Sequence, residues 1–355
     1  MKNYLYYWIQ HLQREPGADV RLFPFLGAAS SLDHEEAVTG RGAAALRLGL
    51  YFWINRLPAA FTQPLFLNSS VFHASKVIHP PRRAKLTATI YDLTCWLVPE
   101  THLPATLAAE REFAKRIWQR ADGLIAISEN SRNDAVRLLR IPEERITVIY
   151  PGVPEVYSCV SQDSVDAVRR QHRLTRPYLL YVGTIEPRKN VDLLLDAYTG
   201  LSSSVAGEFD LVVAGPRGWS GPATLARLEN PSRNVRYLGY VPEIELPALF
   251  AGATAFVYPS LYEGFGFPVA QAMAAGIPVI TSGVSSLPEI TGGAALLVDP
   301  RSQAELQAAI ENILTSPSLR ARLGADGRIR ARRFSWPDGA RRSLDFFSRV
   351  VSGSR

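Results

Sequence analysis

Residues 259–280 read Pro259-Ser-Leu-Tyr-Glu-Gly-Phe-Gly-Phe-Pro-Val-Ala-Gln-Ala-Met-Ala-Ala-Gly-Ile-Pro-Val-Ile280 and decide the expected fold. The apolar run before this stretch predicts a buried strand, and Pro268 is typical of a first helical position. Gly264 and Gly266 lie between them and allow a tight turn with backbone amides pointing outward. A strand, a glycine turn and a helix N-terminus together predict an anion site. Glu263 beside it suits sugar hydroxyls better than a phosphate.

The rest of the chain alternates predicted strands and helices, which favours an α/β protein with parallel sheets. Strands are expected at 86–91, 123–127, 146–149, 178–182, 211–214, 235–238 and 255–258. Between Pro154 and Pro177 the composition turns polar, and no strand is evident there. We therefore expect four parts, which are an N-terminal domain at 1–155, a linker at 156–177, a second domain at 178–333 and a C-terminal segment at 334–355.

Composition excludes several classes of protein. With 355 residues, of which 47% are hydrophobic and 20% charged, the chain fits two globular domains and not a disordered or coiled-coil protein. Its net charge of +6 suits an anionic ligand, although a solvated basic surface explains the charge equally well. The two cysteines form no CxxC motif, and neither an 18-residue apolar run nor a signal peptide is present, so a cytoplasmic location is expected.

The string at 259–280 resembles the donor-binding motif of glycosyltransferase family 4, which consists of retaining enzymes with the two-domain GT-B fold. The resemblance implies two Rossmann-like domains facing across a cleft. It assigns Gly264, Phe265 and Gly266 to donor binding and Glu263 to the hydroxyls of the donor sugar. Gln271 stands where the family has a second Glu, which contacts the ribose. An amide keeps an acceptor oxygen for that contact but loses the charge.

A second block, residues 181–190, places Arg188 and Lys189 near a glycine turn at Gly183. Two cations at such a turn can neutralise a diphosphate leaving group. The resemblance assigns the donor pyrophosphate to this block. Within the family, the sequence of the block is most similar to that of mannosyltransferases. Many relatives have Arg directly after the glycine, where this chain has Thr184, so Arg188 is expected to substitute for it.

Short segments of the first half resemble the family's acceptor side. Asp92 follows a predicted strand, and Tyr91 replaces the histidine that usually precedes the aspartate. Ser128 and Glu129 resemble a Ser-Glu-x-Ser segment, and helix capping explains Ser128 equally well. In the second half, the resemblance places the nucleotide base at a loop formed by Gly239, Tyr240 and Val241. It also implies that the segment after residue 334 folds back on the N-terminal domain.

The expected function is a retaining, metal-independent transfer of a hexose, mannose from GDP-mannose, to a glycan or lipid-linked acceptor in polysaccharide biosynthesis. The catalytic candidates are Glu263, Asp92, Arg188 and Lys189. No cofactor is expected beyond the nucleotide-sugar co-substrate, no metal motif is present, and no nucleic-acid partner is expected. Two alternatives stay open. One is a glucosyl or galactosyl transfer from a UDP-sugar, and the other is a non-catalytic domain that binds nucleotide-sugars.

A peripheral position on the inner face of a membrane is a further expectation, carried by Trp8, Trp53, Arg82, Arg83 and Lys85. Packing and solubility are the competing explanation for these side chains.

Family members begin with a buried strand and a Gly-rich loop, whereas this sequence opens on a predicted helix at residues 3–13. We expect the first strand and loop to be missing from the N-terminal domain. Either a start codon assigned too far downstream or a real truncation would account for their absence.

Overall fold

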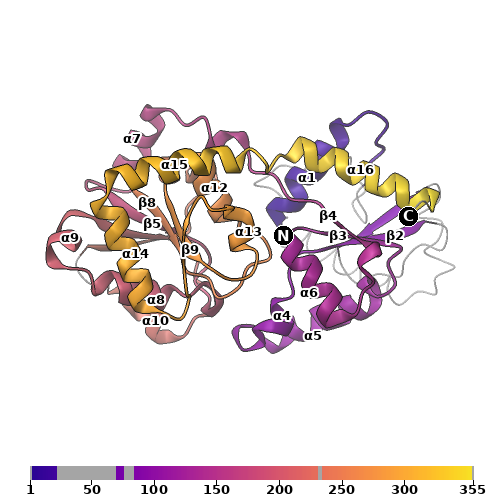
Figure 1. The fold of residues 1–355 in the computed structure, drawn as a ribbon, viewed down its shortest axis with the longest axis horizontal. Coiled ribbons are helices and arrows are strands. Elements are labelled where there is room, and N and C mark those ends of the chain that lie inside the picture. Colours follow the sequence, from indigo (N-terminus) through magenta and orange to yellow (C-terminus); the bar gives the residue numbers. More distant parts are fainter. Residues whose placement is uncertain (1, 22–68, 76–83, 231–233, 354–355) are drawn as a thin grey trace, which may run out of the picture. The chain divides into compact units, whose positions relative to one another are not determined.

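The structure is a computed structural model that describes residues 2–21, 69–75, 84–230 and 234–353 (Figure 1). The chain forms two compact units. Unit 1 contains Met1–Leu97, His102–Gly152 and Ser335–Arg355, and unit 2 contains Val98–Thr101 and Val153–Phe334. Each unit is built on a parallel sheet, which confirms the predicted α/β class. No helix in the described ranges is both long and apolar enough to span a membrane.

Unit 1 has a described sheet of strand order β1-β2-β3-β4. Its strands are β1 (Val71–Ala74), β2 (Lys85–Ile90), β3 (Gly123–Ala126) and β4 (Ile146–Val148). The helices between them are α4 (Thr94–Leu97), α5 (Pro104–Phe113), a π-helical turn (Ala114–Trp118) and α6 (Glu129–Leu139). β3 is buried along its whole length, as expected for a parallel strand covered on both faces.

The first and last helices of the chain lie side by side in unit 1 (Figure 1). They are α1 (Lys2–Arg14) and α16 (Trp336–Ser352). Trp8 is 4% exposed, and its indole Nε1 donates to Ser343 Oγ at 3.0 Å. The ring of Tyr4 packs edge-on against Trp336 at 5.4 Å. The C-terminal segment therefore belongs to the same unit as the N-terminal helix.

Unit 2 has a six-stranded parallel sheet of order β10-β9-β8-β5-β6-β7. Its strands are β5 (Tyr178–Val182), β6 (Asp210–Ala214), β7 (Val235–Gly239), β8 (Ala255–Tyr258), β9 (Val279–Ser282) and β10 (Leu296–Val298). Its helices are α7 (Gln162–Gln171), α8 (Val191–Thr199), α9 (Ser203–Glu208), α10 (Pro222–Glu229), α11 (Leu246–Ala251), α12 (Phe267–Ala275), α13 (Leu287–Thr291), α14 (Gln303–Thr315) and α15 (Pro317–Ala331). The four inner strands β9, β8, β5 and β6 are buried throughout.

The range 156–177, expected as a linker, lies within unit 2 and contains α7. Its polar composition hid a helix of which few positions are apolar. Val165 and Val168 are buried, and α7 packs against α11. Ser161 caps the helix by accepting a hydrogen bond from the amide of Ser164. The segment is therefore part of the second unit and does not connect two units.

A close approach of two glycines fixes the loop after β5. Gly183 N donates to Ala214 O at 2.9 Å, which pins this loop to the end of β6. Gly215 has a φ of +145°, and a Cβ there would lie 1.9 Å from the carbonyl oxygen of Gly183. Only glycine fits such a position without moving the backbone.

We predict that Gly215→Ala destabilises unit 2 by about 3 kcal/mol or more, because the added methyl group overlaps a carbonyl oxygen of a fixed loop. Urea unfolding followed by circular dichroism measures the change. Gly207→Ala is the matched control, since a Cβ at Gly207 meets nothing within 4 Å. Equal stability of the two variants would contradict the close approach.

Candidate active site

Three loops of unit 2 meet at one edge of its sheet. They follow β5, β8 and β9, which are neighbours in the order β9-β8-β5. Because the strands are parallel, their carboxyl ends lie at the same edge, where ligands of open α/β sheets bind. The residues 183–190, 259–266 and 283–286 are therefore brought together, although they are far apart in the sequence.

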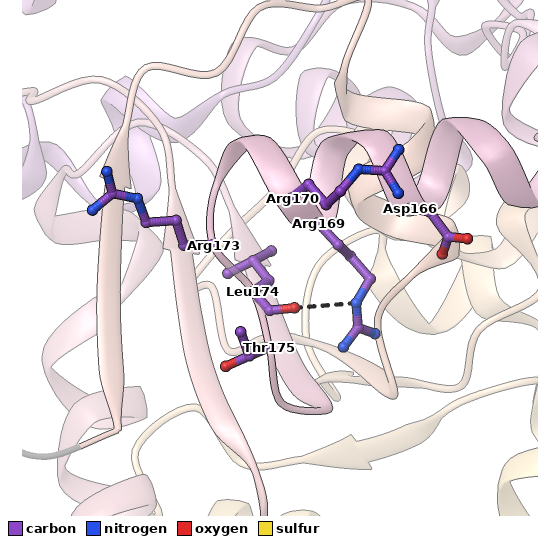
Figure 2. A pocket seen from close by; sticks show the side chains of 6 residues that line it. All are labelled: Asp166, Arg169, Arg170, Arg173, Leu174 and Thr175. Carbon is purple, nitrogen blue, oxygen red and sulfur yellow. Dashed lines mark hydrogen bonds between the residues drawn. The ribbon is translucent and has the colours of Figure 1, made fainter.

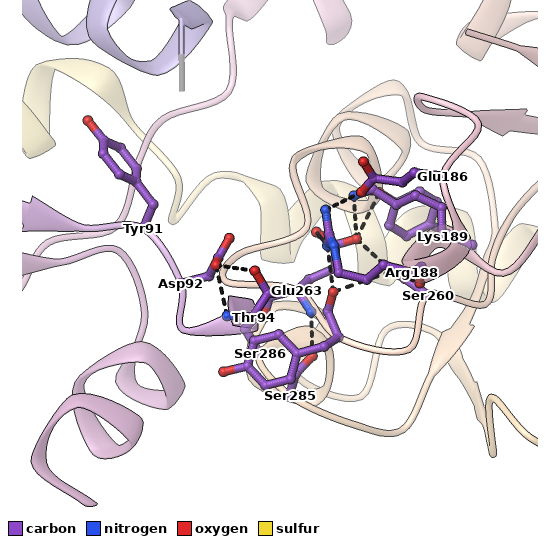
Figure 3. A network of polar contacts seen from close by, with 12 residues as sticks. Tyr91, Asp92, Thr94, Glu186, Arg188, Lys189, Ser260, Glu263, Ser285 and Ser286 are labelled. Atoms are coloured by element: carbon purple, nitrogen blue, oxygen red, sulfur yellow. Dashed lines mark hydrogen bonds and ion pairs between the residues drawn. The ribbon is translucent and has the colours of Figure 1, made fainter. Parts of the chain in front are cut away.

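Glu263 is the centre of a buried polar network at this edge (Figure 3). Glu263 is buried, with 7% of its surface exposed. Oε1 accepts from Lys189 Nζ at 2.5 Å, Ser260 Oγ at 2.7 Å and Tyr258 OH at 3.0 Å. Oε2 pairs with Arg188 at 3.1 Å. The carboxylate thus binds two cations from the loop after β5 and two hydroxyl groups from the end of β8.

The two cations are themselves held by further oxygens. Arg188 donates to Glu186 Oε1 and to the carbonyl of Tyr262, each at 2.6 Å. Lys189 Nζ also donates to Tyr258 OH at 2.6 Å. Both cationic side chains are 12% exposed. The network contains two carboxylates and two cations, so its formal charges cancel.

The ion pairs set the protonation states of the network. Burial alone would raise the pKa of Glu263, but Arg188, Lys189 and the hydrogen bonds outweigh it and lower the pKa to about 2. Burial lowers the pKa of Lys189, and the neighbouring carboxylate of Glu263 opposes that shift. The Glu263 side chain is therefore an ionised acceptor at neutral pH and suits hydrogen bonds from hydroxyl groups.

Backbone contacts fix the positions of the charged side chains. Asn190 adopts a left-handed conformation with φ 59° and donates from Nδ2 to the carbonyls of Pro259 and Pro300. The amide of Glu263 donates to Ser285 Oγ at 3.0 Å, and Ser286 Oγ donates to the carbonyl of Glu263 at 3.0 Å. The loops after β5, β8 and β9 are thus tied to one another.

The remaining predicted donor-side residues lie on the same unit. Gly264, Phe265 and Gly266 are buried, and Gly266 has a φ of +91° directly before α12. Gln271 lies half-buried on α12, and Thr184 is half-buried after Gly183. In the loop that begins at the end of β7, Gly239 has a φ of +66°, Tyr240 is 71% exposed and Val241 is buried.

The predicted acceptor-side residues lie on unit 1 at the carboxyl ends of β2 and β3. Asp92 Oδ1 accepts from the amide and the hydroxyl of Thr94 at 3.0 and 2.6 Å. Burial raises the pKa of Tyr91 well above its ordinary value. Ser128 is fully buried and caps α6 by accepting from the amide of Ser131 at 3.0 Å, which confirms the capping interpretation. Glu129 pairs with Arg132 at 2.7 Å.

The sequence motifs assigned no role to several polar residues of the network. Tyr258 and Ser260 bond directly to Glu263, and Ser285 and Ser286 hold its backbone. A hydroxyl three residues before Glu263 was the available signal for Ser260. On unit 1, burial and the charge of Asp92 raise the pKa of Glu110, a carboxyl that the motifs did not single out.

A surface cavity of about 510 Å³ lies elsewhere on unit 2, along the end of α7 and the turn that leads into β5. Its lining residues are Asp166, Arg169, Arg170, Arg173, Leu174 and Thr175. Figure 2 shows Arg169 bonded to the carbonyl of Leu174, so this guanidinium serves the turn itself. The residues that line the cavity come before β5 in the chain, at its amino end, whereas the loop that carries Arg188 and Lys189 follows its carboxyl end. Among the described residues, no group of three His, Cys, Asp or Glu side chains is arranged to hold a metal ion.

Comparisons with known proteins agree with the fold and the motifs. The family profile described as "Glycosyl transferases group 1" matches residues 164–330, and the one described as "Glycosyltransferase Family 4" matches residues 1–156. O-antigen chain mannosyltransferase B of Escherichia coli is 33% identical over 280 residues, which cover 78% of this chain and 74% of that protein. Serotype-specific mannosyltransferase WbdA of Escherichia coli is 29% identical over 67% of this chain, which spans only 30% of WbdA.

Two solved structures share the fold. WaaG, a glycosyltransferase involved in lipopolysaccharide biosynthesis, has a TM-score of 0.65 at 20% identity and covers 85% of this chain and 83% of its own. Anabaena Alr3699/HepE in complex with UDP and glucose has a TM-score of 0.64 at 20% identity, over 75% of this chain and 72% of its own. The fold and the motifs together define a GT-B glycosyltransferase. The chain belongs to glycosyltransferase family 4.

We predict that the ionised Glu263 stabilises the protein in a pH-dependent way. Its pKa of about 2 lies below the ordinary 4.5, so its contribution is fully present above pH 4.5 and is lost as the pH falls towards 2. The pH-dependent part is about 3 kcal/mol by linkage. Urea unfolding of the wild type and Glu263→Gln between pH 2.5 and 7 measures it.

The matched control is Glu229→Gln, which removes a carboxylate whose ion pair with Arg217 is exposed. An exposed pair contributes little, so its stability difference from the wild type stays nearly constant over this range. A Glu263→Gln difference that is equally flat would contradict the buried ion pairs.

Proposed function

We propose that this glycosyltransferase is a retaining mannosyltransferase that transfers mannose from GDP-mannose to a glycan or lipid-linked acceptor in polysaccharide biosynthesis. The observation that carries the proposal is the ionised, buried Glu263 between two cations at the sheet edge. The similarity to O-antigen chain mannosyltransferase B supports the choice of sugar and of the pathway class. The half-buried Gln271 is proposed for the ribose, and the loop at Gly239–Val241 for the base.

The proposed reaction divides the charged groups by task. Arg188 and Lys189 each donate hydrogen bonds to the diphosphate, in place of some of their bonds within the network. These bonds stabilise the negative charge that grows on the diphosphate as it departs. Glu263 accepts hydrogen bonds from the sugar hydroxyls and orients the ring. The bond between C1 and the diphosphate oxygen breaks, and the acceptor oxygen bonds to C1 on the same face. The proton of the acceptor hydroxyl passes to the departing diphosphate. The proposal needs no metal ion and no cofactor, and it places Asp92 at the acceptor.

The donor experiment tests the proposal directly. We expect GDP-mannose to raise the unfolding temperature, with about 2.7 kcal/mol of stabilisation at 100 times its dissociation constant. GDP should appear slowly even without an acceptor. A larger shift with UDP-glucose would favour the UDP-sugar alternative instead. Binding without any release of nucleotide diphosphate would favour a non-catalytic binding domain.

Lys189→Ala supplies the matched comparison for the donor experiment. A cation on a diphosphate acts in both the bound donor and the transition state, so GDP affinity should fall along with turnover, by about tenfold or more. Arg170→Ala removes the same charge from an exposed position of α7 and should leave GDP affinity unchanged. Unaltered GDP binding in Lys189→Ala would place the phosphates elsewhere.

We further propose a cytoplasmic enzyme that associates peripherally with the inner face of a membrane. Trp8 takes no part in such contact, because it is buried against α16, and Lys85 is paired with Asp122. Trp53, Arg82 and Arg83 lie outside the described residues. Support comes instead from the net charge of +6 and from the surface of α15. Ile329 is exposed on this helix, and so are arginines such as Arg322.

Sedimentation with vesicles tests this association. We expect the protein to pellet with vesicles that contain anionic lipid at low salt and to be released at high salt, because Lys and Arg near an anionic surface attract it electrostatically. Arg322→Glu should weaken the binding. Equal sedimentation with neutral and anionic vesicles would contradict the proposal.

A further inference from the structure

Tyr181 carries a buried hydroxyl group that the site described above does not use. It lies on β5 two residues before Gly183 and is 0% exposed. Its ring stacks on that of Tyr258, with 5.8 Å between the centroids and 28° between the planes. A Cβ added at Gly183 would lie 3.0 Å from the Tyr181 hydroxyl oxygen, so this oxygen lies directly beside the glycine turn.

Within the described part of the chain, the Tyr181 hydroxyl has no hydrogen-bond partner. Four other tyrosines of the same sheet and its covering helices use theirs. Tyr178 donates to the carbonyl of Leu249, Tyr198 to that of Phe209, Tyr237 to that of Gly215, and Tyr258 to Glu263. A buried hydroxyl without a partner costs free energy that phenylalanine at the same position would not. An unexplained cost of this kind at the edge of a binding site points to a contact made in another state of that site.

Two buried carboxylates, Glu263 and Glu186, act on this hydroxyl through their charges. Burial, followed by the charges of Glu263 and Glu186, raises the pKa of Tyr181 well above its ordinary value, so the group stays protonated and can act as a donor. Glu263 has Lys189, Tyr258 and Ser260 as partners besides Arg188. Its loss of Arg188 would therefore leave several donors in place.

Glu186 depends much more strongly on Arg188. It is 5% exposed, and its described contact is the 2.6 Å ion pair with Arg188 (Figure 3). When Arg188 turns to an anionic donor, this carboxylate would be left buried without its cation, which is strongly unfavourable. The Tyr181 hydroxyl lies beside the Gly183 turn, three residues before Glu186, and has no hydrogen-bond partner in the described ranges, so a bond from it can offset part of that loss.

We propose that Tyr181 is a positioning residue that donates to Glu186 when the nucleotide-sugar diphosphate recruits Arg188. The inference rests on the proposed function, because it needs an anionic donor at Arg188. The Tyr181 hydroxyl then stabilises the donor-bound arrangement and contributes no hydrogen bond to the donor-free arrangement. This asymmetry separates it from Tyr258, whose hydroxyl is already bonded in the described structure.

Tyr181→Phe tests the proposal in the full chain. Without ligand, we expect an unfolding temperature equal to or above that of the wild type, because the variant loses an unpaired group. We expect the dissociation constant for GDP, measured by calorimetry, to be three- to tenfold higher than that of the wild type. We also expect a higher KM for the donor. Tyr258→Phe is the matched control, since it should lower the unfolding temperature without ligand.

A double-mutant cycle assigns the partner. In a Glu186→Gln background, the effect of Tyr181→Phe on GDP affinity should shrink to less than half of its value in the wild type, because the acceptor carboxylate is gone. An undiminished effect there, or unchanged GDP affinity of Tyr181→Phe, would overturn the inference. A wild-type protein that binds neither GDP nor UDP would instead overturn the proposed function on which it rests.

Discussion

A single buried carboxylate organises the edge of the unit 2 sheet at which the loops after β5, β8 and β9 meet. An ionised Glu263 inside a protein is tolerated only when charges and hydrogen bonds compensate for its lost hydration. Its partners come from separate loops, with Lys189 after β5 and Ser260 after β8, while Ser285 after β9 holds its backbone. The loops after β5 and β8 therefore owe part of their positions to this charge, whereas the loop after β9 is tied to the backbone of the same residue. Removing that charge would leave Lys189 buried without this carboxylate and Arg188 with Glu186 as its described carboxylate partner, so the effect would reach both the β5 and the β8 loops.

Sequence periodicity predicts the strands of such a fold well, because buried parallel strands are short, continuous apolar runs. β5 and β8 are examples, and both have the predicted bounds. The same reasoning fails for α7, where two buried valines suffice to anchor an otherwise polar helix on α11. It also leaves Ser128 undecided, because a capping serine and a ligand-binding serine look alike until the amide of Ser131 is placed.

The sequence names three charged residues of the network but not their mutual contacts. The motifs name Glu263, Arg188 and Lys189, since strand ends and glycine turns are visible in the sequence. Their mutual pairing depends on β5 and β8 being neighbours, and strand order is a property of the whole sheet. No local sequence pattern marks Ser285, because its hydroxyl accepts a hydrogen bond from the amide of a residue 22 positions away.

The cancelled charge of the network limits what it can bind under the proposed function. Glu186 and Glu263 already occupy the two cations, so an anion must compete with carboxylates that cannot leave. A bare phosphate offers these carboxylates nothing in return. A nucleotide-sugar brings hydroxyl groups that donate to Glu263 while its diphosphate accepts from Arg188 and Lys189, which satisfies both signs of charge at once. Selectivity for the whole donor over its fragments therefore follows from pairing each cation with a carboxylate before the donor arrives.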